Sequence, residues 1–351
     1  MDEAIFYNAL NILKYSDYRE LKELKLRFGS FKNAWQELEP SEKKAVNPEK
    51  EWQKVQELGL KLILLEDLLF PKILREIPWP PFGIYVLGCL PKDESANLAI
   101  VGTRRATETG KSSAKKFAYE LSLAGLKIIS GLALGIDAKS HEGCLEAKGQ
   151  TLAVLGNGLD YFYPKTNSKL AEKILASRGA IISEYPLGAP AQSYHFLERN
   201  RIVSGLSRGV LIIEAPQKSG ALVTAKFALD QNREVFVLPG PASHQNFIGS
   251  HQLIRAGAEL ITKPEEILEV LNISSPKSKS EENIERSVFE TEEEKIIIET
   301  LTKFQDPLSI DKIIELTNLK APVVSQTLSF LLIRNLVKET ETGYIIMNES
   351  R

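Results

Sequence analysis

The sequence predicts an α/β protein built on a parallel β-sheet. First, short apolar runs such as Leu98–Val101 alternate with segments whose apolar residues recur at helical spacing, as in 109–123. Second, a glycine follows these runs, at Gly102 and at Gly131. Short apolar strands that alternate with helices of about 10–15 residues are typical of parallel sheets, whose ligands bind beyond the carboxyl ends of the strands. We therefore expect the function to lie in the loops that begin at Gly102 and Gly131.

The region before the sheet, 1–55, is predicted to form short helices. Phe28–Phe31 and Trp35 lie at a turn between two of them. This pattern favours a small helical bundle packed on aromatic side chains over a hairpin that binds DNA directly. Two further apolar runs, Leu60–Leu65 and Ile84–Leu87, are predicted to be strands that add to one edge of the sheet.

The predicted sheet domain covers residues 56–273. Pro, Ser, Lys and Glu dominate the following segment, 274–286, which indicates a linker. A helical segment follows each of seven expected strands, which are Leu98–Val101, Lys127–Ile129, Thr151–Leu155, Ala180–Ser183, Val210–Glu214, Glu234–Leu238 and Glu259–Ile261.

The last segment, 287–351, has the order of a winged helix. Thr291–Glu294 is a capping box before an apolar helix at Ile296–Leu301, and helices near 309–317 and 321–335 follow. A pair of short strands is expected around Glu341–Gly343. The third helix offers few polar groups for a DNA groove, mainly Ser325, Gln326 and Thr327. We expect this segment to contact a protein or to have lost its role, rather than to bind duplex DNA.

Composition excludes several classes of protein. The chain has 351 residues, of which 43% are hydrophobic and 26% are charged. Apolar runs are all far shorter than the ~20 residues of a membrane span, and the first residues lack the order of a signal peptide, so we expect a cytoplasmic protein without a membrane partner. Cys89 and Cys144 lie far apart, and the four histidines form no ligand-spaced set, so we expect no metal and no cofactor.

The net charge of -2 conceals a separation of charge along the chain. Residues 97–272 carry 20 Lys and Arg against 16 Asp and Glu, whereas residues 287–351 carry 7 against 11. The sheet domain is therefore basic and the last segment acidic. If one part of the chain binds a polyanion, we expect the sheet domain to do so.

Two segments match nucleotide-binding motifs only in part. Gly110–Ser112 resembles the end of a phosphate-binding P-loop, yet Arg105 stands where that loop needs its first glycine. Gly156–Gly158 follows a strand without the third glycine of a dinucleotide fold. Neither a nucleotide triphosphatase nor an NAD enzyme is supported.

The remaining loops suit the phosphates of a polymer. Backbone amides after Gly102 and Gly131 can point at an anion above a helix N-terminus, and Arg104 adds a planar fork that grips a phosphate at two points. The other candidates at the same end of the sheet are Lys165 and Asn167, after one strand, and Arg199, Asn200 and Arg201, at the start of a helix.

Aromatic residues are frequent in the same loops. Most are expected to be packed, but one or two are candidates for stacking on unpaired bases, a contact worth about 1–3 kcal/mol per base. The candidates are Tyr161, Phe162, Tyr163, Tyr185, Tyr194 and Phe196.

Residues 70–271 resemble the DNA-processing protein A family, also called DprA or Smf. The matching segments are VGTR at 101–104, SGLALGID at 130–137, YPKTN at 163–167, ISEYPLG at 182–188, RNRIVSGLS at 199–207, SGALVTA at 219–225 and REVFVLPG at 233–240. The flanks fit as well, because family members often carry an N-terminal domain similar to a SAM domain and a C-terminal winged helix.

The resemblance implies a Rossmann-like protein that binds single-stranded DNA, protects incoming strands in natural transformation and loads the recombinase RecA. By matching position it implies DNA contacts at Gly102, Thr103, Arg104, Lys165, Asn167, Asn200 and Arg201. It also implies a homodimer formed through about 248–261, with RecA contact in the same neighbourhood and Leu253, Ile254 and Ile261 as apolar candidates.

Two other functions remain open. The fold also looks remotely like nucleotide-hydrolysing LOG (lysine decarboxylase-like) proteins, but the comparable stretch, 219–229, contains no Asp or Glu to assist glycosidic cleavage. Glu214, at a strand end, is the residue that keeps this enzymatic alternative open. The other alternative is a duplex-DNA regulator that acts through the winged helix, and the acidic balance of that segment argues against it.

Overall fold

The computed structural model describes most of the chain, in two compact units at 1–276 and 277–351. The described residues are 2–14, 16–91, 96–273, 292–304, 307–334, 336–340 and 342–346. The predicted linker, 274–286, lies outside them, so its structure stays a prediction.

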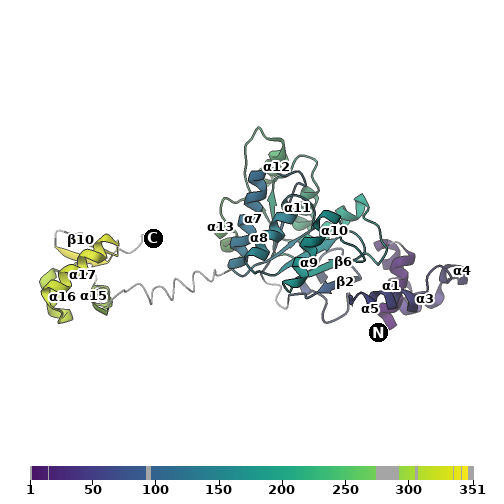
Figure 1. Ribbon diagram of the computed structural model, residues 1–351, viewed down its shortest axis with the longest axis horizontal. Coiled ribbons are helices and arrows are strands. Elements are labelled where there is room, and N and C mark those ends of the chain that lie inside the picture. Colours follow the sequence, from purple (N-terminus) through teal and green to yellow (C-terminus); the bar gives the residue numbers. More distant parts are fainter. Residues whose placement is uncertain are drawn as a thin grey trace. The chain divides into compact units, whose positions relative to one another are not determined.

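A nine-stranded sheet forms the centre of the first unit (Figure 1). Its spatial order is β1-β2-β6-β5-β4-β3-β7-β8-β9. The strands are β1 Lys61–Leu64, β2 Gly83–Gly88, β3 Asn97–Gly102, β4 Lys127–Ser130, β5 Thr151–Leu155, β6 Ala180–Ser183, β7 Gly209–Ile213, β8 Glu234–Val237 and β9 Glu259–Leu260.

All seven strands expected between 98 and 261 are present and pair in parallel. The two earlier strands, β1 and β2, extend the sheet at the β6 edge, as the sequence predicts, and they pair antiparallel there. The chain builds outward from β3 in one direction and then, from β7, in the other. This reversal between β3 and β7 makes the sheet Rossmann-like and marks the point where such sheets bind their ligands.

Helices cover both faces of the sheet because successive strand residues point to opposite sides. In β3, Ala99 and Val101 pack with residues of α10 (Ser193–Gly205) and α11 (Gly220–Asp230). Leu98 and Ile100 pack on the other face with α7 (Glu108–Leu123). The remaining helices of this part are α6 Lys72–Arg75, α8 Ile136–Glu146, α9 Ser168–Ala176, α12 Ile248–Arg255 and α13 Pro264–Val270.

The N-terminal helices form a small bundle on aromatic side chains, as expected. Phe31 and Trp35 are buried there, and the ring of Tyr18 stacks on Phe82 at 5.1 Å between centroids. The helices are α1 Asp2–Leu13, α2 Tyr18–Phe28, α3 Phe31–Glu37, α4 Pro40–Lys43 and α5 Pro48–Glu57. The bundle shares this core with Leu64 of β1, so it belongs to the same compact unit as the sheet.

The described residues of the second unit form three helices followed by an antiparallel strand pair. Its core includes Ile297, Ile313, Leu328 and Val337. The elements are α15 Glu292–Thr302, α16 Ile310–Thr317, α17 Ala321–Ile333, β10 Val337–Thr340 and β11 Gly343–Ile346. The expected helices and strands are thus present, whereas Thr291 of the predicted capping box lies outside the described residues.

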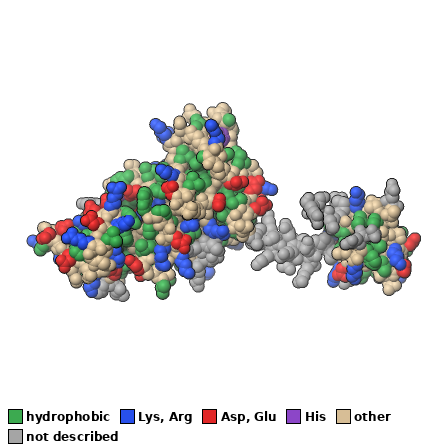
Figure 2. Space-filling model, turned by 180° about the vertical axis from the view of Figure 1, so that it is seen from behind, with side chains coloured by type: hydrophobic (Ala, Val, Ile, Leu, Met, Phe, Trp, Pro, Cys, Tyr) green, Lys and Arg blue, Asp and Glu red, His purple; other side chains and the backbone are tan. Residues whose placement is uncertain are grey.

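The surface of the first unit carries both signs of charge. On the face drawn in Figure 2, Lys and Arg side chains are interspersed with Asp and Glu. Among the described residues, none of the helices combines the length and the hydrophobicity that crossing a bilayer requires.

The strand packing predicts a large cost for truncating the centre of β3. We expect Ile100→Ala to lower the free energy of unfolding by about 2–5 kcal/mol, because Ile100 is fully buried between the sheet and α7. Urea unfolding followed by circular dichroism measures this. Leu229→Ala is the control, since Leu229 is 57% exposed and its truncation is expected to change stability by less than about 0.5 kcal/mol. Equal losses in the two variants would contradict the packing described.

Candidate nucleic-acid interface

A pocket of about 630 Å³ opens beyond the carboxyl ends of β3 and β7. Its walls come from segments far apart in the sequence: 101–105 at the end of β3, Pro216 and 218–221 after β7, and residues of α10 between Ser193 and Asn200. The pocket therefore lies where the strand order reverses, which is the expected place for a ligand in this class of sheet.

The β3 loop presents two arginines to this pocket. A Cβ on Gly102 would lie 1.9 Å from the Ile213 carbonyl oxygen, so only glycine allows β3 and β7 to approach this closely. The Thr103 amide then donates to the Glu214 carbonyl at 2.8 Å. Arg104 and Arg105 follow on the exposed side and both line the pocket.

Glu214 holds this loop in place. Its carboxylate is fully buried and accepts hydrogen bonds from the Thr107 amide at 2.9 Å, from the Thr107 hydroxyl and from Asn246 Nδ2 at 2.8 Å. The same Asn246 amide donates to the Arg105 carbonyl at 3.0 Å. Glu214 is therefore a structural carboxylate, engaged on both oxygens and enclosed away from the pocket.

The N-terminus of α11 forms the opposite wall. Ser219 caps the helix by accepting from the Ala221 amide at 3.2 Å, and Ser219, Gly220 and Ala221 all line the pocket. The first amides of a helix carry a partial positive charge that favours anions. Exposed Lys218, just before the cap, adds a full charge. Lys218 is not among the residues predicted from the sequence, although its place between a strand end and a helix N-terminus is a usable signal.

Arg199 lines the floor of the pocket and Gly131 lies outside its lining, and both are already engaged in hydrogen bonds, which corrects the expectation that both are free to meet an anion. Arg199 is 4% exposed, and its Nη1 donates to the Gly131 carbonyl at 3.0 Å and to the Val154 carbonyl. The Gly131 amide donates to Asp137 Oδ2 at 3.0 Å. Arg199 ties the ends of β4 and β5 to α10 and forms the floor of the pocket.

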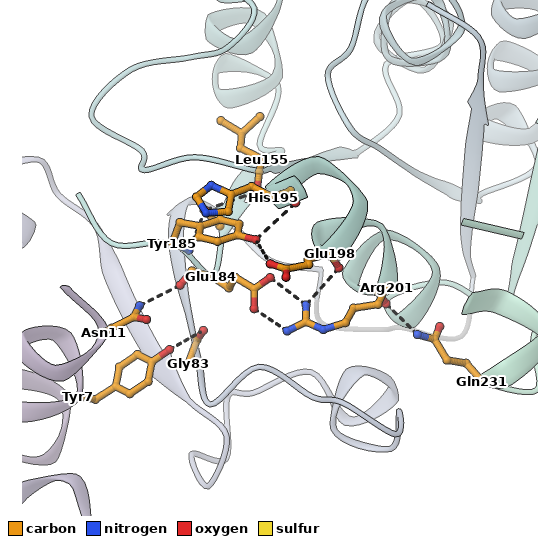
Figure 3. Close-up of polar contacts among 11 residues, drawn as sticks. Tyr7, Asn11, Gly83, Leu155, Glu184, Tyr185, His195, Glu198, Arg201 and Gln231 are labelled. Carbon is orange, nitrogen blue, oxygen red and sulfur yellow. Dashed lines mark hydrogen bonds and ion pairs between the residues drawn. The ribbon is translucent and has the colours of Figure 1, made fainter. Parts of the chain in front are cut away.

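Arg201 points away from the pocket, which corrects its expected contact role. It is 6% exposed, and its guanidinium forms a two-point ion pair with Glu184, with Nη1 to Oε1 at 2.9 Å and Nη2 to Oε2 at 2.5 Å (Figure 3). Arg199 and Arg201 are two residues apart on a helix and so project from different faces.

The remaining sequence-predicted residues differ in their positions. Asn200 lines the pocket and donates from Nδ2 to the Gly220 carbonyl at 3.2 Å, which joins α10 to α11. Asn167 donates to the carbonyls of Leu132 and Ala133 at 2.8 and 3.3 Å, so it orders the loop after β4. Lys165 is exposed in a short 3₁₀ turn, Lys165–Asn167, outside the pocket lining.

Two of the six candidate aromatics line the pocket. Tyr163 and Phe196 have ring centroids 5.4 Å apart, and the Arg104 guanidinium lies 5.2 Å from the centre of the Phe196 ring. These three residues also border a side cavity of about 60 Å³. Tyr185 is buried, whereas Tyr194 is 49% exposed.

The charge of the pocket lining is positive. It contains four cationic side chains, Arg104, Arg105, Arg199 and Lys218, and one carboxylate, that of buried Asp137. Burial raises the pKa of Asp137, an effect opposed by Arg199, and burial lowers the pKa of Arg199 to about 10. Arg199 therefore stays charged near neutral pH and contributes to the potential above the floor.

The residues predicted for the dimer interface differ in burial. Ile261 is 1% exposed and packs in the core beside α13, which corrects its expected place on an interface. Leu253 and Ile254, on α12, are partly buried against the core.

The described part of the chain contains no group of His, Cys, Asp and Glu side chains arranged to hold a metal ion.

Comparisons with known proteins place the sheet domain in one family. The sequence profile of the DNA recombination-mediator protein A family matches residues 61–272. Protein Smf of Synechocystis is 44% identical over 227 residues, which are 64% of this chain and 57% of that protein. Protein Smf of Escherichia coli is 45% identical over 210 residues, which are 60% of this chain and 56% of that protein. The chain thus spans less than two thirds of the length of these two relatives.

Two solved structures are similar to the chain. DNA processing protein A of Streptococcus pneumoniae matches with a TM-score of 0.60 and 34% identity, over 65% of this chain and 80% of that one. DNA processing protein A of Helicobacter pylori matches with a TM-score of 0.53 and 32% identity, over 61% of this chain and 97% of that one. The Helicobacter structure concerns a single-stranded DNA binding mode.

We expect the protein to lose stability in acid because His141, on α8, is buried. Burial and then Arg199 lower the pKa of its imidazole from 6.5 to about 3, so the folded protein keeps it neutral while the unfolded chain protonates it below its usual pKa. The free energy of unfolding should therefore fall as the pH drops below about 6.5, with His141 contributing up to about 1.4 kcal/mol per pH unit.

The measurement is urea unfolding at several values between about pH 6.5 and pH 4.5, the window in which an ordinary histidine titrates. We expect His141→Leu to have a shallower dependence on pH than the wild type. His244→Gln is the control, because His244 is exposed. A slope in His141→Leu equal to that of the wild type would show that His141 does not cause the sensitivity.

Proposed function

The chain belongs to the DNA recombination-mediator protein A family, and we propose that it binds single-stranded DNA in the pocket between β3 and β7. One observation carries the proposal: Arg104, Arg105, Lys218 and the positive end of α11 surround a single pocket although they come from separate loops. The single-stranded DNA binding mode of the similar Helicobacter protein supports the same conclusion.

The chemistry of the pocket favours the phosphate backbone over the bases. The Arg104 guanidinium offers a planar fork for two phosphate oxygens, Lys218 offers a point charge, and the α11 amides offer oriented donors. Tyr163 and Phe196 give apolar surface on which an unpaired base stacks without sequence preference. A single strand can turn its phosphates and bases into a pocket of this size, whereas a rigid duplex cannot.

We infer the wider role from the resemblance to the family. We place the chain in DNA processing during natural transformation, where it protects incoming single strands and loads RecA onto them. It acts there as a cytoplasmic homodimer that uses the region around Leu253 and Ile254. The N-terminal bundle corresponds to the SAM-like domain of family members, and the second unit to their winged helix, with a protein-contacting role.

A binding function fits the pocket better than catalysis does. Hydrolysis of a nucleotide needs a carboxylate that stabilises the sugar cation or positions water. The oxygens of Glu214 already accept hydrogen bonds from Thr107 and Asn246, and Asp137 is buried. Release of free base from a nucleoside monophosphate at turnover level would instead favour the LOG-type enzyme.

The proposal predicts that Arg104→Ala weakens binding of oligo-dT and of mixed-sequence single strands alike. Each neutralised phosphate contributes about -0.7 to the slope of log affinity against log salt for single strands, so losing one contact should make the slope shallower by about that amount. Gel shifts with single- and double-stranded DNA at two or more salt concentrations measure both effects. Arg19→Ala is the control, since Arg19 is an exposed arginine on α2 outside the pocket. Arg104→Ala protein that is folded and binds as tightly as the wild type would disprove the pocket assignment.

Lys218 gives an independent check from the opposite wall. Lys218→Ala should weaken single-strand binding and flatten the salt dependence by a similar amount, about 0.7 in slope, because the side chain is an exposed charge at the helix cap. Gln217→Ala, at the neighbouring exposed position, should bind like the wild type. If the two variants bind equally well, the α11 wall does not contact DNA.

A further inference from the structure

The helix α10 has two faces with different tasks. Phe196, Arg199 and Asn200 face the pocket, where they meet Arg104, Gly131 and Gly220 respectively, as the contacts above establish. Exposed Glu198 and buried Arg201 lie on another face, in a polar network that does not line the pocket (Figure 3). The second face therefore fixes where the first one lies.

The centre of this network is the Glu184–Arg201 ion pair. Both side chains are nearly enclosed, with exposures of 11% for Glu184 and 7% for Arg201. Burial alone lowers the pKa of Arg201, but the adjacent Glu184 carboxylate outweighs that effect and raises it. A buried pair of this kind is costly to break from one side, because the partner is left as an uncompensated charge.

Four elements meet at this pair. Glu184 follows β6, and its backbone carbonyl accepts from Asn11 Nδ2 of α1 at 3.0 Å. The Arg201 carbonyl accepts from Gln231 Nε2, at the end of α11, at 3.0 Å. The network thus joins the N-terminal bundle and the sheet to both helices that wall the pocket.

Tyr185, next to Glu184, contacts the N-terminal half of α10. Its hydroxyl donates to Glu198 Oε2 at 3.1 Å, and its ring stacks on His195 with centroids 4.0 Å apart. The backbone around Glu184 and the first two turns of α10 are thereby held as one body. Displacement of the ion pair must move the helix that carries Phe196, Arg199 and Asn200.

We propose that the Glu184–Arg201 ion pair is a positioning element for the DNA pocket, so that Arg201 acts through α10 and the α1 bundle reaches the pocket through Asn11 and Glu184. The inference rests on the proposed function, because it concerns binding of single-stranded DNA at that pocket. It assigns to Arg201 an effect on DNA affinity without any contact to a phosphate.

The decisive variant is Glu184→Gln. A positioning role and a direct DNA contact of Arg201 predict different changes in DNA affinity for this variant. If Arg201 positions α10, removing the carboxylate charge should weaken binding of oligo-dT by about fivefold or more, the lower range of typical coupling between sites, with the salt slope unchanged. If Arg201 instead contacts DNA, releasing it from Glu184 should leave binding as tight or make it tighter, with a steeper salt slope. The latter result overturns the proposal.

Arg201→Lys gives the same discrimination from the other partner. Lysine keeps the charge and binds phosphates, but it cannot form the two-point fork with Glu184. Positioning predicts weaker binding at an unchanged slope, whereas direct contact predicts binding close to the wild type. Tyr7→Phe is the control, because the Tyr7 hydroxyl donates to the Gly83 carbonyl at the same bundle–sheet boundary rather than to the ion pair.

Circular dichroism and thermal unfolding verify that each variant is folded. Should the charge variants fail to fold, Asn11→Ala provides the milder test, because it removes only the bond to the Glu184 carbonyl and the neighbouring bond to the Tyr85 hydroxyl. It should weaken binding at an unchanged slope, and wild-type affinity would contradict the inference. Arg104→Ala measured in parallel separates the proposed DNA pocket from the positioning role. If Arg104→Ala binds as tightly as the wild type, the pocket assignment is wrong. If Arg104→Ala weakens binding and Glu184→Gln does not, only the positioning role fails.

Discussion

The close approach of β3 and β7 is the constraint on which the rest of the structure depends. Gly102 leaves no room for a side chain against the Ile213 carbonyl, and the Thr103 amide bonds the Glu214 carbonyl. The chain leaves this junction in opposite directions across the sheet, so the β3 loop and the start of α11 open a crevice between them. Arg104 and Lys218 reach one pocket because the strands behind them are neighbours.

Two buried arginines of α10, Arg199 and Arg201, hold this helix in place beside the crevice. Arg199 joins α10 to the ends of β4 and β5, and Arg201 joins α10 to Glu184. Both charges are enclosed. Arg199 lines the pocket floor and adds to its potential, Arg201 is compensated by Glu184, and the exposed cations Arg104, Arg105 and Lys218 remain open to a ligand. Under the proposed function, binding of the DNA backbone and rigidity of the pocket wall fall to different arginines.

The sequence predicted the strands well, because apolar runs bounded by glycine leave few alternatives for a parallel sheet. It also located Arg104 correctly at a strand end. It failed where burial depends on strand order: Arg199 and Arg104 were both expected to meet an anion, yet Arg199 is buried against the ends of β4 and β5 and Arg104 is exposed. The error at Arg201 was avoidable, since residues two apart on a helix cannot both face one pocket. Ile261 was misplaced because it follows an exposed edge strand but turns into the core.

The most direct measurement of the central claim is a crystal structure of the full chain with oligo-dT. We expect a backbone phosphate at the α11 N-terminus within hydrogen-bonding distance of the Ser219 and Gly220 amides, with the Arg104 guanidinium on the same or the next phosphate. Density for DNA confined to another surface, with the β3–β7 pocket free of nucleotide, would contradict it.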